Sequence, residues 1–187
     1  MNTPNKLTVF RMLMTPIFLA AILIDVPHRF IWAILTFSIA AITDAIDGKL
    51  ARKNNQITVF GKLTDPVADK MLTTAALLAF MQLGLCNIWI VLIILTREFA
   101  VTSIRLVASA EGIIIPANIW GKVKTVSQMT FTILIMLLKE IEYMGFIPAS
   151  VPLPLISNIL LSITAFLTVV SGAIYIVESS KLIDFSK

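Results

Sequence analysis

Six apolar segments dominate this sequence, each close to the ~20 residues that a helix needs to cross a bilayer. Hydrophobic residues make up 58% of the 187 residues and charged residues 14%, against roughly 25% charged in a soluble domain. One soluble core cannot bury that much apolar surface, so we expect an all-α integral membrane protein with six transmembrane helices. The predicted helices cover residues 4–24, 30–52, 59–83, 88–109, 118–138 and 154–177.

Turn-forming residues separate the segments and leave no stretch for a second domain. Polar, Gly or Pro residues fall at 25–28, 53–56, 83–87, 111–112 and 148–154. Lys6 and Arg11 precede the first apolar run, as in a signal peptide, but no small-x-small cleavage site follows. We therefore expect a retained first helix and one domain over residues 1–187.

Lysine and arginine residues predict the orientation of the chain. With the N-terminus in the cytoplasm, the opposite side holds only Arg29 and Lys139. Ten lysines and arginines then lie on the cytoplasmic side, which predicts cytoplasmic N- and C-termini in a cell-membrane protein. They are Lys6, Arg11, Lys49, Arg52, Lys53, Lys62, Lys122, Lys124, Lys181 and Lys187. The net charge of +4 fits such loops and anionic phosphates rather than nucleic acid.

Four aspartates stand at helical spacing at the cytoplasmic ends of the second and third segments. Asp44 and Asp47 are three residues apart, and Asp65 and Asp69 are four apart, so each pair shares a helix face. The short linker makes the two helices antiparallel neighbours, which brings the two faces together. Aspartates are costly at membrane depth, so this group indicates a functional site.

A divalent cation would resolve the repulsion among these carboxylates. Oxygen ligands without nearby His or Cys favour Mg²⁺, Mn²⁺ or Ca²⁺ over zinc. Four carboxylates exceed what one Mg²⁺ usually takes from a protein, which makes two ions plausible. Small residues beside them (Gly48, Ala51 and Gly61) would either permit close helix packing or let a ligand approach the backbone, and Arg52 offers a fork suited to phosphate.

The whole pattern resembles the signature of the CDP-alcohol phosphatidyltransferases. That signature is Asp-x-x-Asp-Gly-x-x-Ala-Arg, eight residues, then Gly-x-x-x-Asp-x-x-x-Asp. It is matched here at every defined position: Asp44, Asp47, Gly48, Ala51, Arg52, Gly61, Asp65 and Asp69. The resemblance implies transfer of a phosphatidyl group from CDP-diacylglycerol, a membrane lipid, to an alcohol, with release of CMP. It also implies two divalent metals, Mg²⁺ or Mn²⁺, and a homodimer.

The resemblance also assigns roles to the matched residues. Asp44, Asp47 and Asp65 would bind the metals on the pyrophosphate. Asp69 would lie near the metals and act as the catalytic base on the acceptor hydroxyl. The CDP site would be lined by Gly48, Ala51 and Arg52, with Gly61 on the opposing helix. Outside the signature, Asn5 and Thr8 share roughly one helical face at the cytoplasmic end, and they would either begin an interfacial helix or help to wall the nucleotide site.

Basic residues in the fourth and fifth segments should select the alcohol. Pro-Asn-x-x-Thr-x-x-Arg at the start, Arg97-Glu98 and Gly-Lys-x-Lys-Thr from Gly121 look like the bacterial branch of that family that makes phosphatidylglycerophosphate. That resemblance implies sn-glycerol 3-phosphate as acceptor. A doubly charged phosphate needs basic partners. The candidates are Arg97, Arg105, Lys122 and Lys124.

Other functions remain open on the sequence alone. An inositol phosphate acceptor would need the same basic residues. A UbiA-type prenyltransferase would have its two aspartate motifs in separate regions, whereas here both lie within 44–69. A divalent-cation transporter would place its carboxylates near the bilayer midplane, on discontinuous helices.

Overall fold

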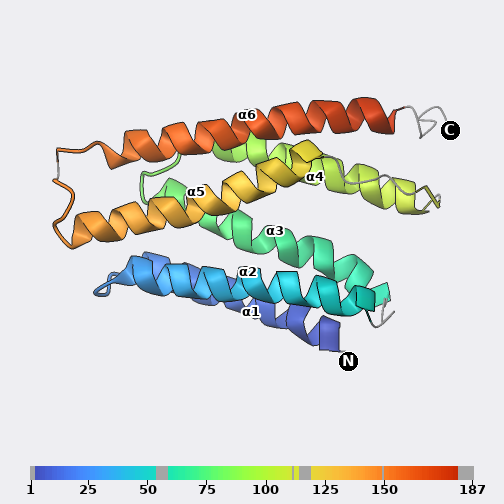
Figure 1. Ribbon diagram of the computed structural model, residues 1–187, viewed down its shortest axis with the longest axis horizontal. Coiled ribbons are helices and arrows are strands. Elements are labelled where there is room, and N and C mark those ends of the chain that lie inside the picture. Colours follow the sequence, from blue (N-terminus) through green and yellow to red (C-terminus); the bar gives the residue numbers. More distant parts are fainter. Residues whose placement is uncertain (1–2, 54–58, 111, 114–118, 149, 181–187) are drawn as a thin grey trace.

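The computed structural model is all helical, and the residues that it describes contain no strand (Figure 1). It describes residues 3–53, 59–110, 112–113, 119–148 and 150–180. The side chains of residues 3–4, 44–53, 59–63, 65, 69 and 110 lie outside the described part. The helices are α1 (Thr3–Leu23), α2 (Arg29–Lys53), α3 (Val59–Gln82), α4 (Ile88–Ala110), α5 (Ile119–Tyr143) and α6 (Leu153–Ser179).

Each predicted segment coincides with one helix, and one predicted boundary was wrong. We expected the fifth helix to end at 138, but α5 continues to Tyr143. Its last turn is charged, which made it look like a loop. Lys139 pairs with Glu142 within that turn, and Glu140, which is only 1% exposed, pairs with His28. These two interactions stabilise the extra turn as helix.

The helices alternate in direction and form two groups of three. α1 packs on α2 and α3, and α6 packs on α4 and α5; contacts of α2 with α5 and of α3 with α4 join the groups (Figure 1). α1 begins and α6 ends at the same end of the bundle, which we call the terminal end (Figure 1). The ends of α2 and α4 and the starts of α3 and α5 lie there too.

The apolar core fills the half of the bundle away from the terminal end. Phe18 of α1 packs on Phe37 of α2 with ring centroids 5.6 Å apart. Phe80, Ile94 and Leu161 extend this core into α3, α4 and α6, and all three are completely buried. In a membrane such side chains stabilise this half of the bundle by close van der Waals packing between the helices rather than by removal from water.

Polar side chains fill much of the interior near the terminal end. Asn5, Thr8 and Arg11 of α1 and Lys124 and Gln128 of α5 are all at most 8% exposed. Buried polar groups are costly unless they are paired, so this half is the part of the fold where a function can account for them.

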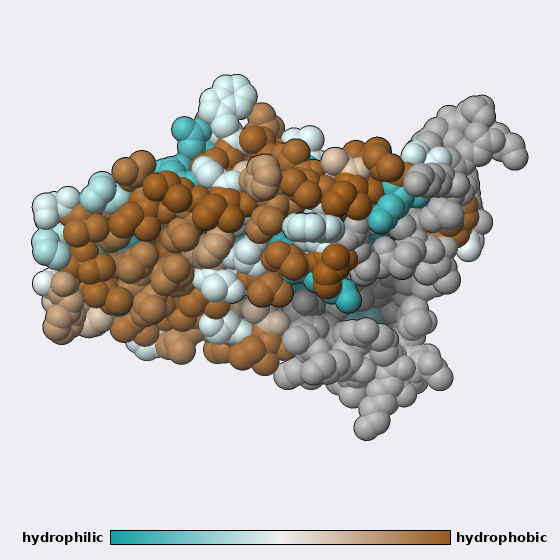
Figure 2. All heavy atoms as spheres, turned by 45° about the horizontal axis from the view of Figure 1, so that its top comes forward, coloured by the Kyte–Doolittle hydropathy of each residue, from teal (hydrophilic) through white to brown (hydrophobic). Residues whose placement is uncertain are grey.

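The outer surface is strongly apolar. Large exposed side chains such as Trp89, Phe99 and Phe166 occur on the helices, and apolar residues cover most of the described face in Figure 2. Among the described residues, two helices are long and apolar enough to cross a membrane, Asn5–Leu23 and Leu153–Ser179. These features suggest a membrane protein. Six spans and cytoplasmic termini stay predictions.

Candidate active site

A cavity of about 570 Å³ opens between α3, α4 and α5. We call it the basic cavity, because five of its lining residues are lysine or arginine. They are Lys70 of α3, Arg97 and Arg105 of α4, and Lys122 and Lys124 of α5. Its other lining residues are Thr73, Glu98, Val101, Thr102, Gly121, Thr125, Val126, Gln128 and Met129.

Helical periodicity explains how α4 and α5 supply this wall. Residues 97, 98, 101, 102 and 105 of α4 recur at spacings of three and four, so they share one face. Residues 121, 124, 125 and 128 do the same on α5. The basic residues therefore face a common space, while exposed apolar residues such as Leu106 and Val123 occupy other faces.

Glu98 is the centre of an ion network in this cavity. Its Oε1 accepts from Nζ of Lys124 at 2.5 Å and from Nη1 of Arg97 at 3.2 Å. Its Oε2 lies 3.9 Å from Nζ of Lys70. The side chain of Lys124 is only 3% exposed, so Glu98 supplies the partner that its buried ammonium group needs.

Two glycines lie beside Arg97, and one of them makes room for it between the helices. A Cβ on Gly172 of α6 would lie 2.8 Å from Cγ of Arg97, closer than real side chains approach. A Cβ on Gly121 of α5 would lie 3.7 Å from its Nη2, an ordinary contact. Gly172 therefore allows Arg97 to lie against α6, a packing role that the sequence had not indicated.

Arg105 is held by a residue that sequence reasoning missed. Its Nε donates to the hydroxyl of Tyr175 at 3.3 Å, and its guanidinium carbon lies 5.3 Å from the centre of the same ring. Tyr175 belongs to α6 and is 1% exposed. It stands 70 residues from Arg105, so no local spacing could have predicted the pair.

The structure thus brings Arg97, Arg105, Lys122 and Lys124, the four predicted acceptor-phosphate residues, to one cavity. It adds Lys70, which we had left unassigned. Among the described residues, Arg105 and Lys122 form no ion pair with a carboxylate, whereas Lys70, Arg97 and Lys124 share Glu98. The cavity therefore keeps an excess of positive charge suited to a phosphate.

The motif aspartates lie on the neighbouring helix ends. Asp44 and Asp47 belong to α2 near its end, and Asp65 and Asp69 belong to α3 near its start, both at the terminal end (Figure 1). Their side chains, and those of Gly48, Ala51, Arg52 and Gly61, lie outside the described residues. Asp69 directly precedes Lys70, so α3 supplies both a motif position and a wall of the basic cavity.

Asn5 and Thr8, predicted to wall the nucleotide site, point into the bundle. Asn5 is 8% exposed and Thr8 is 1% exposed, and each has an interaction partner. Both lie in the first turns of α1 at the terminal end, where α1 packs on α2 and α3. Neither lines the basic cavity.

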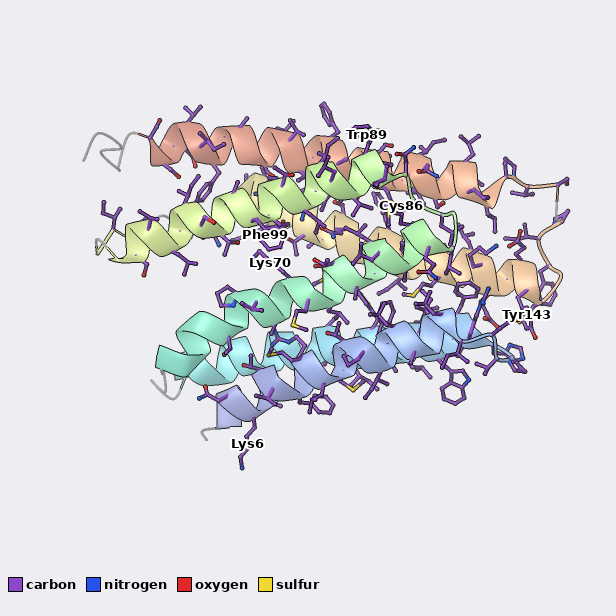
Figure 3. All side chains as sticks on the ribbon, turned by 180° about the vertical axis from the view of Figure 1, so that it is seen from behind. Lys6, Lys70, Cys86, Trp89, Phe99 and Tyr143 are labelled. Carbon is purple, nitrogen blue, oxygen red and sulfur yellow. The ribbon has the colours of Figure 1, made fainter. Side chains whose placement is uncertain are left out.

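An apolar groove of about 470 Å³ joins the basic cavity at Lys70 and Thr102, which line both. It is formed by α1, α3 and α4, and Lys70 and Phe99 lie on its two sides (Figure 3). Apart from Lys70, no charged side chain of the described residues lines it. A polar cavity and an apolar groove therefore lie side by side, with Lys70 and Thr102 between them.

Comparison with known proteins identifies the class. A statistical model of the CDP-alcohol phosphatidyltransferase family matches residues 1–171. The chain belongs to the CDP-alcohol phosphatidyltransferase family, whose members use divalent metals.

Three relatives match this chain over most of its length. The chain is 36% identical over 187 residues to the CDP-diacylglycerol–glycerol-3-phosphate 3-phosphatidyltransferase of Bacillus subtilis, covering 91% of each chain. It is 34% identical over 178 residues to the protein of the same name from Rickettsia bellii, covering 93% of each. It is 37% identical over 183 residues to a probable phosphatidylglycerophosphate synthase of Mycobacterium tuberculosis, covering 95% of this chain and 81% of that relative.

Proposed function

We propose that the chain transfers the phosphatidyl group of CDP-diacylglycerol to sn-glycerol 3-phosphate, giving phosphatidylglycerophosphate and CMP. The names of the relatives give this donor and acceptor. The observation that carries the proposal is the basic cavity, which gathers five cations around one carboxylate beside the motif helix α3. A phosphate-bearing acceptor requires such a space, and a neutral alcohol does not.

The four aspartates, Asp44, Asp47, Asp65 and Asp69, are proposed to hold two divalent ions, Mg²⁺ or Mn²⁺. Their chemistry fits, since hard carboxylate oxygens from the ends of two neighbouring helices are the ligands that these ions prefer. Ions held there would supply positive charge to the pyrophosphate and to the CMP leaving group. Asp69 takes the proton from the attacking hydroxyl.

The remaining residues are proposed to bind three parts of the substrates: the acceptor phosphate, the CDP moiety and the lipid. Arg97, Arg105, Lys122 and Lys124 form the positive site for the acceptor phosphate, and of these Arg105 and Lys122 have no carboxylate partner among the described residues. Lys70 lies at the α3 edge of the same space. The CDP moiety lies against Gly48, Ala51, Arg52 and Gly61, with Asn5 and Thr8 behind them. The apolar groove beside the cavity supports a substrate that is part lipid and part polar.

The membrane arrangement is part of the proposal. The chain forms one domain with six spans, and its terminal end faces the cytoplasm, where both CMP and the acceptor are soluble. The alternating helices and the apolar surface support this arrangement. We also propose a homodimer in the cell membrane, on the family resemblance.

The test mixes purified protein with CDP-diacylglycerol, Mg²⁺ or Mn²⁺, and a panel of acceptors: sn-glycerol 3-phosphate, inositol 1-phosphate, glycerol and serine. We expect CMP release with sn-glycerol 3-phosphate, and its loss on adding a chelator. Release mainly with inositol 1-phosphate would correct the acceptor. No release with any alcohol, together with divalent-cation flux in liposomes, would replace the proposal with a transporter.

A further inference from the structure

Glu98 has one carboxylate oxygen that the protein uses and one that faces the cavity. Oε1 accepts from both Lys124 and Arg97. The printed contact of Oε2 is the ion pair with Nζ of Lys70, at 3.9 Å, which is too long for a hydrogen bond. The side chain lines the basic cavity and keeps 21% of its surface exposed, so Oε2 is open to a ligand.

Glu98 is also the only charged acceptor on the described wall of the cavity. Lysine and arginine side chains have donors and no acceptor, so the five basic residues can bind a phosphate but cannot accept a hydrogen bond from a hydroxyl. A carboxylate oxygen is a strong acceptor for such a hydroxyl. The cavity therefore has separate places for an anionic group and for a hydroxyl group.

These two places lie two helical turns apart on one face of α4. Arg105 stands seven residues beyond Glu98, which is about 10 Å along the helix. Arg105 and Lys122 have no carboxylate partner among the described residues, so the excess positive charge lies toward the terminal end. A small acceptor would place its phosphate there and its hydroxyl end at Glu98.

Glu98 also lies on the side of the cavity formed by α3, the helix that carries the proposed base. Its Oε2 faces Lys70, which follows the proposed base Asp69 on α3. The acceptor carries two hydroxyls, of which one attacks and one stays intact. Holding the intact hydroxyl beside α3 would present the other to the proposed base.

We propose that Glu98 is a specificity-determining residue, whose Oε2 accepts a hydrogen bond from the acceptor hydroxyl that does not react. Its Oε1 meanwhile keeps Lys124 and Arg97 in place. This inference rests on the proposed function. It goes further in stating that the enzyme selects a phosphate carrying a second hydroxyl, and in assigning that selection to one oxygen atom.

The test is a two-by-two comparison of acceptor and protein. The acceptors are sn-glycerol 3-phosphate and 3-hydroxypropyl phosphate, which keeps the phosphate and a primary hydroxyl but lacks the second hydroxyl. The proteins are wild type, Glu98→Gln and Glu98→Ala. In wild type we expect kcat/KM to be about tenfold or more higher for sn-glycerol 3-phosphate, as for a hydrogen bond to a charged group.

This ratio should fall to roughly threefold in Glu98→Gln, whose neutral amide accepts more weakly, and to about one in Glu98→Ala. A loss common to both acceptors measures the positioning of Lys124 and Arg97, and only the change in ratio measures hydroxyl recognition. Glu142→Gln, the same change in an ion pair outside the cavity, should leave the ratio at the wild-type value.

Three results would overturn the inference. Equal use of the two acceptors by wild type would show that no second hydroxyl is recognised. An unchanged ratio in Glu98→Gln would assign the recognition to another residue, and this variant keeps the size of the side chain if Glu98→Ala does not fold. No CMP release by wild type with either acceptor would overturn the proposed function as well, which separates the two failures.

Discussion

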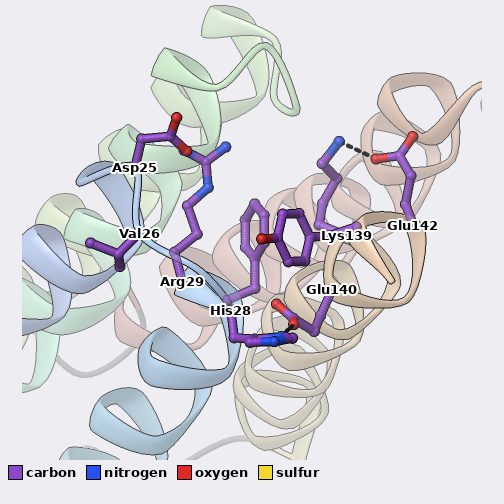
Figure 4. A pocket seen from close by; sticks show the side chains of 9 residues that line it. Asp25, Val26, His28, Arg29, Lys139, Glu140 and Glu142 are labelled. Atoms are coloured by element: carbon purple, nitrogen blue, oxygen red, sulfur yellow. Dashed lines mark hydrogen bonds and ion pairs between the residues drawn. The ribbon is translucent and has the colours of Figure 1, made fainter. Parts of the chain in front are cut away.

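Two groups of charged residues, at different ends of the bundle, differ in how their acids and bases are paired. The opposite-end cluster is Asp25, His28, Arg29, Lys139, Glu140 and Glu142, around a cavity of about 150 Å³ (Figure 4). There each acid has one basic partner: Arg29 donates to Asp25 at 3.3 Å, Lys139 pairs with Glu142, and His28 Nδ1 lies 2.6 Å from Glu140 Oε1. In the basic cavity, three cations share Glu98 and two have no acidic partner among the described residues.

The difference separates charges that hold the fold from charges that await a ligand. Paired charges in a small space neutralise each other and tie the α1–α2 turn to the end of α5. An excess of one sign beside about 570 Å³ of space is unfavourable until an anion enters. The predictions below test this division, beginning with the largest expected effect.

Asp69→Asn should lower kcat at least about 100-fold, because it removes the proposed general base beside the basic cavity. The fold and some binding of CDP-diacylglycerol should remain, as measured by thermal unfolding and by a lipid-binding assay. Asp25→Asn makes the same change in the opposite-end cluster and should leave kcat within about twofold. Wild-type turnover in Asp69→Asn would remove its role as base.

Arg105→Ala should raise the KM for sn-glycerol 3-phosphate by about tenfold or more, because it removes a charged donor to the phosphate. The KM for CDP-diacylglycerol should change much less. Arg29→Ala is the matched control in the opposite-end cluster and should change neither constant. If Arg105→Ala raises both KM values equally, its bond to Tyr175 has a structural role instead.

Gly172→Ala should raise the acceptor KM several-fold and lower the melting temperature, because the new Cβ would displace Arg97. Overpacking of this kind costs about 1–3 kcal/mol. Gly121→Ala touches the same guanidinium at an ordinary distance of 3.7 Å and should have little effect on either quantity. Equal effects of the two substitutions would mean that Arg97 is not confined by α6.

Glu140→Gln should lower stability without changing catalysis. Glu140 is 1% exposed and bonded to His28, so loss of its charge should cost about 1–3 kcal/mol. Thermal unfolding in detergent measures this loss, and the KM for both substrates should stay at wild-type values below the melting temperature. A changed acceptor KM would contradict the assignment of this cluster to the fold.

Local patterns predicted the helices and the motif, because both depend on residues close together in the chain. The Asp44-to-Asp69 signature is visible in one stretch, and the length and hydropathy of the apolar segments located each helix. Interactions between residues far apart in the chain could not be predicted from local patterns. Glu98 reaches Lys70 and Lys124 on two other helices, and Arg105 reaches Tyr175, 70 residues away. Whether Arg97 and Glu98 form a closed pair or part of a larger network depends on how α3, α4 and α5 pack, because Lys70 and Lys124 come from α3 and α5.

The predicted end of α5 was wrong because the partners of its last charged residues could not be read from the local sequence. Lys139, Glu140 and Glu142 look like loop residues in sequence, because charge usually ends an apolar segment. Their partners are tertiary or lie one turn away: His28 comes from the α1–α2 turn, 112 residues from Glu140. Pairing lets a helix continue with charges that hydropathy alone would place outside it.

Exposing Cys86 to an alkylating reagent should have the smallest effect on activity. Cys86 belongs to the turn between α3 and α4, away from both the basic cavity and the motif helix ends. Burial raises the pKa of its thiol to about 11, because the apolar surroundings disfavour the thiolate. The thiolate is the reactive form, so alkylation by iodoacetamide should be very slow at pH 8 and accelerate as the pH rises toward 11. Treatment at pH 8, followed by mass spectrometry and the CMP-release assay, should leave the thiol unmodified and the activity unchanged. Rapid alkylation accompanied by loss of acceptor binding would mean that this turn is open and coupled to the cavity, which would contradict the separation of the two ends.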